Sequence, residues 1–111
     1  MPIERWSDTV IVAHLADDPQ FTEDLESLDA MTGAKGKAAH AVLDFAAVHF
    51  INSSNLAKLL KLRTRMIKTD RRLMLCNIPT PVWGTFLVTG LDKVFNFSDN
   101  VPTSLATIQI A

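Results

Sequence analysis

Two adjacent serines, Ser53 and Ser54, lie where the chain changes character. The segment FINSSNLAKLLKLR (50–63) passes from an apolar run, through four small polar residues, into a pattern typical of an amphipathic helix. A serine pair at such a junction fits four chemistries: a phosphate-binding turn, a catalytic nucleophile, a phosphorylation site, or capping of the helix that follows. The neighbouring residues discriminate between these possibilities.

A catalytic triad is one possibility, since Asp44, His49 and Ser53 fall within ten residues. A serine nucleophile on a strand-to-helix turn needs the G-x-S-x-G geometry, however, and no glycine occurs from 37 to 83. Neither a G-x-G-x-x-G turn nor a P-loop is present to bind phosphate. We therefore expect no catalytic residues and no enzymatic activity. A small enzyme that uses Ser53 with His49 is the rival hypothesis from another class, which a serine-reactive probe tests.

The chain has no recognisable metal, cofactor or nucleic-acid motif. Its three histidines and single cysteine lack the spacing of metal ligands, and Cys76 is expected to be inert packing in a strand. Seven of the eleven basic residues lie between 58 and 72, but no aromatic residues are interleaved with them and the net charge is −1. We expect no metal, no cofactor and no nucleic-acid partner.

Length and composition predict one domain over 1–111. A chain of 111 residues with 48% apolar residues can build one core. A single cysteine excludes an internal disulfide and is typical of a reducing cytosol. No apolar stretch approaches the roughly 20 residues that span a bilayer, and the first residues, MPIERWSD, include acids where a signal peptide would have bases. A cytoplasmic protein without membrane insertion is expected.

The first half of the chain predicts a hairpin, a helix and a buried strand. MPIERW and TVIVAHLA are apolar-rich runs separated by a turn, and Asp17-Asp18-Pro19 is a typical start for a helix over 19–32. The segment GAKGK (33–37) is expected to be a loop. The segment AAHAVLDFA (38–46) is nearly continuous in apolar residues, which is typical of a strand covered on both faces.

The second half continues the alternation of helices and strands. A helix over 54–68 is expected to turn one apolar face inward and its basic residues outward; the apolar face comprises Leu56, Leu59, Leu60, Met66 and Ile67. A strand follows within 71–78, then a helix opened by two prolines and ended by Gly90. A short strand over 93–97 and a final helix over 101–110 complete the chain.

This order of elements, β-β-α-β-α-β-α-β-α, predicts an α/β fold. Repeated strand–helix units favour parallel strands joined by right-handed crossovers, and the N-terminal hairpin adds one antiparallel strand at an edge. We expect a mixed sheet of about five strands, mostly parallel, with about four helices.

Two stretches of the sequence resemble the signature of STAS domains, the family of anti-sigma-factor antagonists. The first is VLDFAAVHFINSSNLAKLLKLR (42–63). In that family a buried strand bearing an aspartate runs through a short loop into Asp-Ser-Ser-Gly-Leu at the start of an amphipathic helix. The second is LVTGLDKVFNFSDN (87–100), which is similar to a recurrent helix end in Thr-Gly-Leu followed by a short strand. The order of elements extends the resemblance over 9–108 and implies a STAS-like fold.

The resemblance implies a binding module that switches between partners. In the family the first serine after the aspartate is phosphorylated, and that position is Ser53 here. The unphosphorylated form would bind an anti-sigma factor, often itself a serine protein kinase, and phosphorylation would end the binding. Monomer and weak dimer are both compatible with the sequence. The surface for the partner is expected to comprise Phe50, Asn52, Ser53, Ser54, Asn55, Leu56 and Lys58.

Two positions depart from the family pattern, because Asn52 replaces the usual aspartate and Asn55 the usual glycine. Asn52 keeps a capping oxygen without the charge, and Asn55 is expected to add bulk beside the surface that a partner approaches. Serine and asparagine are both good helix caps, so capping by Ser53 stays open beside regulation. The alternative function is a STAS adaptor or scaffold without phosphorylation, as in a stressosome component or a partner of a lipid-transport ATPase.

Overall fold

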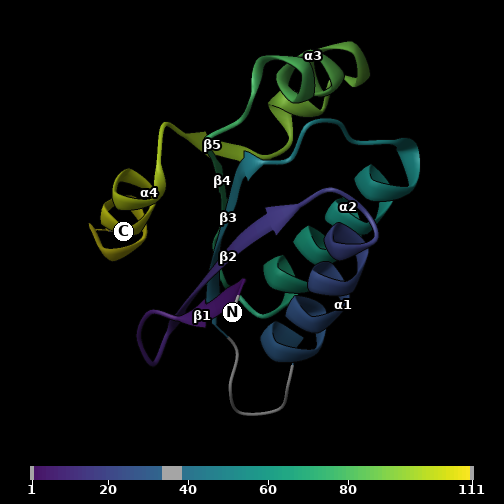
Figure 1. Ribbon diagram of the computed structural model, residues 1–111. Helices are drawn as coiled ribbons and strands as arrows, with labels where there is room; N and C mark the ends of the chain where they lie inside the picture. The colour runs from purple at the N-terminus through teal and green to yellow at the C-terminus, as the bar shows by residue number, and fades with distance from the viewer. Residues whose placement is uncertain (1, 34–38, 111) are drawn as a thin grey trace.

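A computed structural model describes residues 2–33 and 39–110 of the chain. Within these residues, five strands form one sheet in the order β1-β2-β3-β4-β5 (Figure 1). β1 pairs with β2 antiparallel and the remaining pairs are parallel, as the sequence predicts. The strands span Ile3–Arg5 (β1), Val10–Ala16 (β2), His40–Ala47 (β3), Leu73–Cys76 (β4) and Asn96–Ser98 (β5).

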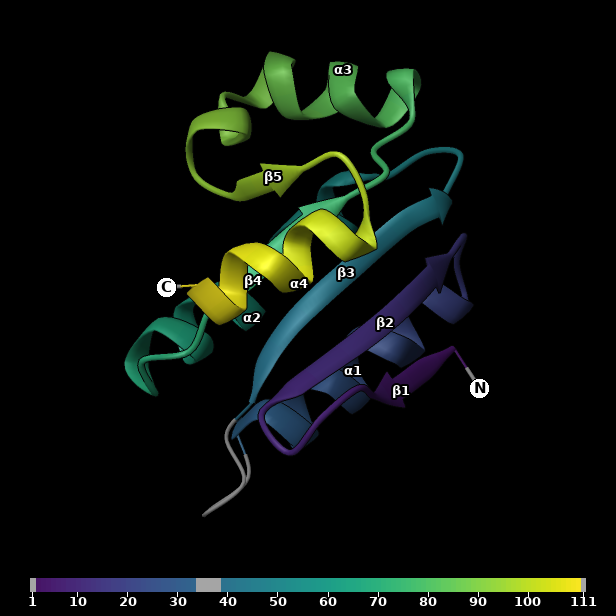
Figure 2. The same cartoon turned by 90° about the vertical axis from the view of Figure 1, so that its left-hand side faces the viewer.

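The four α-helices in the described part of the chain lie on three sides of this sheet (Figure 1 and Figure 2). α1 and α2 cover one face side by side, α4 lies on the opposite face, and α3 lies beyond the carboxyl ends of β3 and β4. This arrangement confirms the predicted α/β fold. The helices span Gln20–Gly33 (α1), Ser53–Lys68 (α2), Thr80–Thr89 (α3) and Val101–Ile110 (α4).

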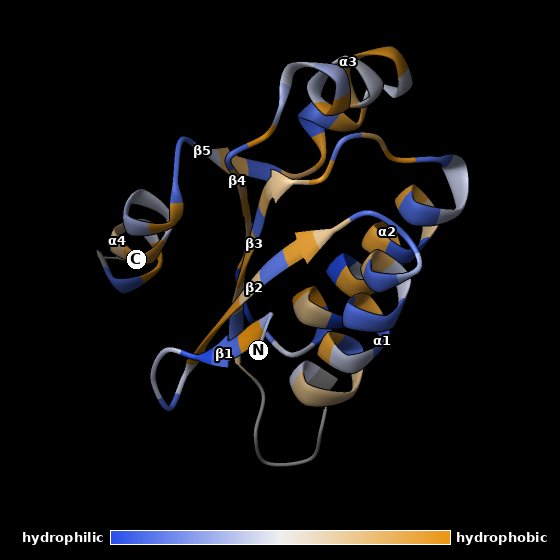
Figure 3. Cartoon of the chain, viewed as in Figure 1, coloured by the Kyte–Doolittle hydropathy of each residue, from blue (hydrophilic) through white to orange (hydrophobic). Residues whose placement is uncertain are grey.

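The main core lies between the sheet and the pair formed by α1 and α2. Leu59 of α2 is fully buried there. The ring of Phe45 packs edge-to-face against Phe21 at 5.9 Å and against Phe86 at 6.3 Å, so α1, β3 and α3 share one aromatic cluster. In Figure 3 strand β4 is coloured mainly hydrophobic, and all four of its residues are buried, which agrees with a strand covered on both faces.

A smaller core lies between the other face of the sheet and α4. Ile108 packs there on valines of β2 and β3 and on Met74 and Cys76 of β4. Burial raises the pKa of the Cys76 thiol to about 11, so the thiol is protonated and unreactive at neutral pH. The prediction that Cys76 packs in a strand is confirmed.

The buried face of α2 differs from the predicted face near the end of the helix. Ile67 was predicted to point inward, but it is 56% exposed, and Leu62 is buried instead. Successive helical residues are turned by about 100°, so Ile67 cannot share the inward direction of its neighbour Met66. Leu56, Leu59 and Met66 are buried as predicted.

Two predicted segment boundaries also change. Leu91–Lys93 form a short 3₁₀ helix, so the strand predicted over 93–97 begins only at Asn96. Gly33 belongs to α1, and the rest of the predicted GAKGK loop (34–37) lies outside the described residues. Gly90 ends α3 as predicted, with a left-handed φ of 74° that favours glycine.

Candidate functional site at the start of helix α2

The predicted serine pair lies at the edge of the sheet where the parallel strands end. β3 ends at Ala47, a loop occupies 48–52, and α2 begins at Ser53. In open α/β sheets, functional sites gather at this carboxyl edge, because the loops that leave the strands converge there. The loop and the first turn of α2 therefore lie where a functional site is expected.

Two asparagines cap the start of α2. The side-chain oxygen of Asn52 accepts a hydrogen bond from the backbone N–H of Asn55 at 2.8 Å, and the side-chain oxygen of Asn55 accepts one from the backbone N–H of Asn52 at 3.0 Å. This reciprocal pair is a capping box that satisfies two backbone donors at once. Of the two residues that the sequence offered as caps, Asn52 occupies the cap position and Ser53 does not.

Asn55 also ties α2 to the beginning of α1. Its side-chain N–H donates to Asp18 at 2.8 Å, and the other oxygen of that carboxylate accepts bonds from the backbone and hydroxyl of Thr22. The bond from Asn55 and then the bonds from Thr22 lower the pKa of Asp18, helped by the charge of Lys58. A negative charge therefore lies next to the helix start although residue 52 itself is uncharged.

The neighbouring acid, Asp17, holds the loop before α2. Its carboxylate accepts the backbone N–H of His49 at 2.8 Å and contacts the Nδ1 atom of the same residue at 2.7 Å. The backbone bond and then the ring bond lower the pKa of Asp17. Two consecutive acids at the start of α1 thus fix both ends of the segment 49–55.

The same contacts divide the predicted partner surface into an outer and an inner set. Ser53 and Ser54 are exposed, and neither has a side-chain hydrogen bond within the described structure. Phe50 is also exposed, at 62% of its surface. In contrast, Asn55 and Leu56 are 3% and 7% exposed.

The inward direction of Asn55 and Leu56 corrects one expectation from the sequence. Asn55 does not add bulk to the outer surface, because its side chain points inward to Asp18. Leu56 belongs to the main core. Asn52 is exposed and Lys58 is half-buried, so both remain at the rim. Within the predicted set, Asn55 and Leu56 therefore support the surface from beneath.

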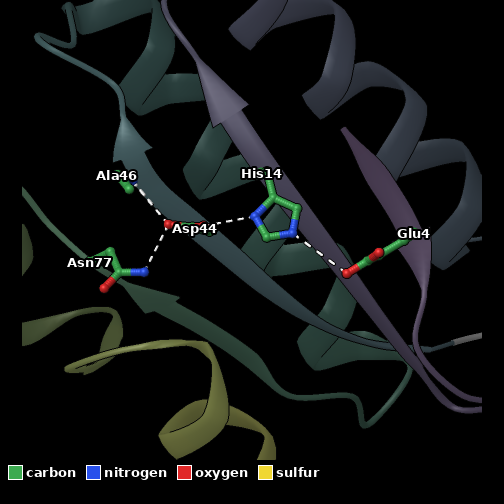
Figure 4. Close-up of polar contacts among 5 residues, drawn as sticks. All are labelled: Glu4, His14, Asp44, Ala46 and Asn77. Carbon is green, nitrogen blue, oxygen red and sulfur yellow. Dashed lines mark hydrogen bonds and ion pairs between the residues drawn. The ribbon is translucent and has the colours of Figure 1, made fainter. Parts of the chain in front are cut away.

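The suspected triad of Asp44, His49 and Ser53 is not assembled. The ring of His49 contacts Asp17, while Asp44 contacts His14 of β2 at 2.7 Å (Figure 4). Ser53 is hydrogen bonded to neither histidine within residues 2–33 and 39–110. The lack of glycines around Ser53 also argues against a triad, and the geometry agrees.

The Asp44–His14 pair is a second polar cluster on the sheet. The other oxygen of Asp44 accepts from the backbone of Ala46 and the side chain of Asn77, each at 3.0 Å, and Glu4 lies 3.5 Å from the far nitrogen of His14 (Figure 4). The hydrogen bond to Asp44 raises the pKa of His14, although partial burial opposes it. Burial acts to raise the pKa of Asp44, but its three hydrogen bonds outweigh that effect and lower the pKa.

Sequence reasoning missed the structural roles of Asp17 and Asp18 in this site. The two residues of a capping box lie three positions apart in the sequence, so the Asn52-x-x-Asn55 spacing could have indicated it. Asp17 and its partner His49 are 32 positions apart in the sequence, and Asp18 and its partner Asn55 are 37 apart. No local sequence pattern indicates contacts over such distances. Both acids were interpreted only as the start of a helix.

Two further kinds of feature, a metal centre and a membrane span, are not found in the described part of the chain. No group of three His, Cys, Asp or Glu side chains there is placed to hold a metal ion. Among the helices described, none has the length and apolar character needed to cross a membrane.

Comparison with known families gives a clear result. The sequence profile of the STAS domain matches residues 7–104, which include the start of α2, Asp17 and Asp18, and the Asp44–His14 pair. The chain belongs to the STAS domain family. The assignment agrees with the resemblance found in the two sequence stretches. No match is found among curated proteins.

Solved structures share this STAS fold at low sequence identity. A Thermotoga maritima protein assigned as an anti-sigma factor antagonist aligns with a TM-score of 0.83 at 14% identity, over 97% of this chain and 93% of its own. The Bacillus cell fate determinant SpoIIAA in its phosphorylated form has a TM-score of 0.73 at 16% identity, over 95% of each chain. A sulfate transporter family protein of Wolinella succinogenes has a TM-score of 0.77 at 15% identity, over 91% and 85%. At these identities the structural likeness concerns the fold.

Proposed function

We propose that this STAS domain is an anti-sigma-factor antagonist whose binding to its partner is controlled by phosphorylation of Ser53. The partner is a protein, an anti-sigma factor with serine kinase activity, and ATP is used by that kinase. The unphosphorylated domain binds the partner and so releases a sigma factor. Phosphorylation of Ser53 ends the binding. The domain acts in the cytoplasm, where both partners of such a switch are found.

One observation carries the proposal: the Ser53 hydroxyl is exposed and plays no part in holding the fold. Asn52 and Asn55 cap the helix, and Asp17 and Asp18 anchor the loop. A kinase can therefore modify Ser53 without disturbing a structural hydrogen bond. A serine that served as the cap would lose that role on phosphorylation.

The charge of a phosphate has opposite effects inside and outside the domain. Phosphorylation adds about −1.5 to −2 charges at neutral pH. Ser53 is the first residue of α2, where the positive end of the helix dipole favours an anion by typically about 0.3–1 kcal/mol. The fold should therefore tolerate the modification. A partner that approaches the outer surface meets a new charge beside two existing carboxylates, Asp17 and Asp18, and loses its fit.

The docking surface contains both an apolar and a polar part. The exposed ring of Phe50 offers the largest apolar contact beside the serines. Asn52, Ser53 and Ser54 offer exposed polar groups around it. A central aromatic residue with a polar surround is the usual composition of an energetically important protein contact. Lys58 lies at the rim of this surface.

The proposal is tested with three immobilised forms of the domain: wild type, Ser53→Glu and the matched control Thr80→Glu. Thr80 is the first residue of α3 and is exposed, so this control adds the same charge at an equivalent helix position on the same edge of the sheet. Each bait is exposed to lysate from cells that express the protein, and retained serine kinases are quantified by mass spectrometry. We expect wild type and Thr80→Glu to retain the same kinase. Ser53→Glu should retain at least tenfold less, about 1.4 kcal/mol of binding.

Equal retention by Ser53→Glu and Thr80→Glu would contradict control of binding by Ser53. Circular dichroism of all three forms provides the control for folding. The Ser53→Ala variant should bind like wild type, because the substitution adds no charge to the surface. Loss of binding in Ser53→Ala alone would indicate that the hydroxyl is a contact rather than a switch.

A second candidate function is an adaptor or scaffold without phosphorylation. The replacement of the usual aspartate and glycine by Asn52 and Asn55 favours it, because both changes fall in the phosphorylation motif itself. The adaptor also fits a fold shared with a sulfate transporter family protein. The two functions predict different results for Ser53→Glu. If the domain is an adaptor, this variant retains the partner as well as wild type does.

Either function is one of binding rather than catalysis. We expect purified protein to show no esterase, phosphatase or ATPase activity above that of Ser53→Ala. The separate partners of His49 and Asp44 support this expectation. Turnover that is lost in Ser53→Ala would overturn it.

A further inference from the structure

The opposite edge of the sheet carries a concentration of arginine side chains. There the chain leaves α2 and turns into β4 through Asp70, whose φ of 57° lies in the left-handed region. The backbone N–H of Arg71 donates to the carbonyl of Met66 at 2.8 Å, which closes the turn. This turn places Arg71 and Arg72 next to the start of β3, at His40. Ser53 lies beyond the other end of β3.

Two surface clefts meet at these arginines. One, of about 310 Å³, is lined by His40, Asp70, Arg71, Arg72 and Ile108. The other, of about 130 Å³, shares Arg71 and Arg72 and adds Arg63 of α2. We call His40, Arg63, Arg71 and Arg72 the basic cleft. Its three guanidinium groups face one carboxylate, that of Asp70, among the lining residues described.

Two of these guanidinium groups have no acidic partner in the described structure. Arg65, two residues further along α2 than Arg63, pairs with Asp29 at 2.9 Å. Arg63 is half-buried and Arg72 exposed, and neither forms an ion pair within residues 2–33 and 39–110. A half-buried guanidinium without a counter-charge gains from binding an anion, because its own hydration is incomplete.

The ring of His40 adds a neutral hydrogen-bond donor to the same cleft. Its Nδ1 atom accepts the backbone N–H of Arg72 at 2.8 Å, so the proton of the neutral ring is on Nε2. Burial lowers the pKa of His40, and the charges of Arg71 and Arg72 lower it further, while Asp70 opposes them. The ring is therefore neutral at pH 7 and can donate from Nε2.

We propose that the basic cleft binds a phosphate group or its sulfate analogue. Arginine matches the geometry of such oxyanions because its planar fork can donate two parallel hydrogen bonds to two oxygens. Arg72, which lines both clefts and has no acidic partner in the described structure, is the central contact. Arg71 lines both clefts as well, Arg63 lines the smaller one, and the Nε2–H of His40 in the larger one donates a further bond. The phosphate group belongs either to a small free anion or to a phosphorylated side chain of a protein. This site is independent of Ser53 and of the proposed partner switch.

The test is an NMR titration of ¹⁵N-labelled protein with sodium phosphate at pH 7, compared with sodium chloride at equal ionic strength. We expect saturable shifts at His40, Arg71 and Arg72 with phosphate and none that saturate with chloride. The pKa of His40 should rise in the presence of phosphate, because the bound anion offsets the charges of Arg71 and Arg72 that face the ring. Asp70, the facing acid, is present in both titrations.

Two variants with the same change in charge make the test specific. Arg72→Gln should weaken phosphate binding at least tenfold, whereas Lys68→Gln, an exposed residue of α2 outside both clefts, should change it less than twofold. A second titration with N-acetyl phosphoserine amide separates the sources: binding indicates a phosphorylated chain as ligand, and no binding indicates a free anion. Shifts that do not saturate, or that weaken equally in Arg72→Gln and Lys68→Gln, would overturn the proposal.

Discussion

Helices α2 and α3 begin at the same edge of the sheet, after the neighbouring parallel strands β3 and β4, but their first turns are built differently. α2 starts with the capping box of Asn52 and Asn55, which is tied onward to Asp18. α3 is preceded by Pro79 at the cap position, which makes no side-chain capping bond, and a second proline, Pro81, lies in its first turn. Side-chain hydrogen bonds therefore fix where α2 begins. The start of α3 is fixed by proline geometry and by the packing of Val82 and Phe86.

The difference shows how a serine can be kept exposed and without a hydrogen bond in an ordered segment. At the start of α2, every structural task is carried by residues other than the serines: Asn52 caps, Asn55 and Asp18 connect the helices, and Asp17 holds the loop. Ser53 and Ser54 are left exposed on a rigid support. The start of α3 has no such division of roles, since its order comes from ring constraints and burial.

The largest difference in stability between the two helices is expected when the packing beneath α2 is removed. Leu59→Ala empties a fully buried position and should cost about 2–5 kcal/mol of the free energy of unfolding. Val88→Ala on α3 is the matched control, because Val88 is 89% exposed, and it should change stability by less than about 0.5 kcal/mol. Urea titration measures both. A loss below 1 kcal/mol in Leu59→Ala would contradict the burial of this face of α2.

The second prediction separates the cap from the serine. Asn52→Ala removes the capping oxygen and should cost about 1–2 kcal/mol of the free energy of unfolding. Ser53→Ala should cost less than about 0.5 kcal/mol, because its hydroxyl makes no bond in the fold. Thr80→Ala at the start of α3 should behave like Ser53→Ala. If Ser53→Ala destabilised the domain as much as Asn52→Ala, the serine would have the structural role that we exclude.

The third prediction concerns the link between α2 and α1. Asp18→Ala leaves the buried amide of Asn55 without its acceptor and should cost about 1–2 kcal/mol at pH 7. The pKa of Asp18 is lowered in the fold, so its charge stabilises the protein above pH about 4, and this contribution falls as the pH drops through the lowered pKa. The difference in urea midpoint between wild type and Asp18→Ala should therefore narrow at low pH. A difference that stays constant down to pH 2 would contradict the charged bond.

The smallest effect is expected at the Asp44–His14 pair. The pKa of His14 is raised in the fold, so the protonated ring stabilises the protein fully below pH about 6.5, and this contribution is lost as the pH rises through the raised pKa. NMR titration should give a pKa for His14 above about 6.5 in wild type and a lower one in Asp44→Asn. An unchanged pKa in Asp44→Asn would mean that the contact to Asp44 does not carry the shift.

Local sequence patterns predicted most of the fold, because helices and strands depend mainly on the types of residues that are adjacent in sequence. Apolar runs and helical spacing located the strands and helices, and the glycine at position 90 located the end of α3. One error arose where two adjacent apolar residues could each face the core. Ile67 fits the helical pattern, but Met66 next to it points inward, so Ile67 points away from the core. The 3₁₀ helix over Leu91–Lys93 was likewise not visible in a pattern that suits a strand.

The place of the serine pair at the start of α2 was predicted, but the contacts that hold this segment were not. The exposed serines follow from the motif and lie where it predicted. The inward orientation of Asn55 depends on Asp18, which is distant in sequence, so no local pattern could indicate it. The same holds for Asp17 and His49. Contacts between distant polar residues are fixed by the assembled fold, and the sequence alone does not pair them.

The central claim is that Ser53 is the residue through which a kinase controls this domain. Its most direct test is phosphopeptide mass spectrometry of the protein purified from cells that express it, in separate free and partner-bound fractions. We predict phosphate on Ser53 in the free fraction, its absence from the partner-bound fraction, and no phosphate on Thr80 in either. An unmodified Ser53 in both fractions, under conditions where the partner is both bound and released, would contradict the claim and leave the adaptor as the function.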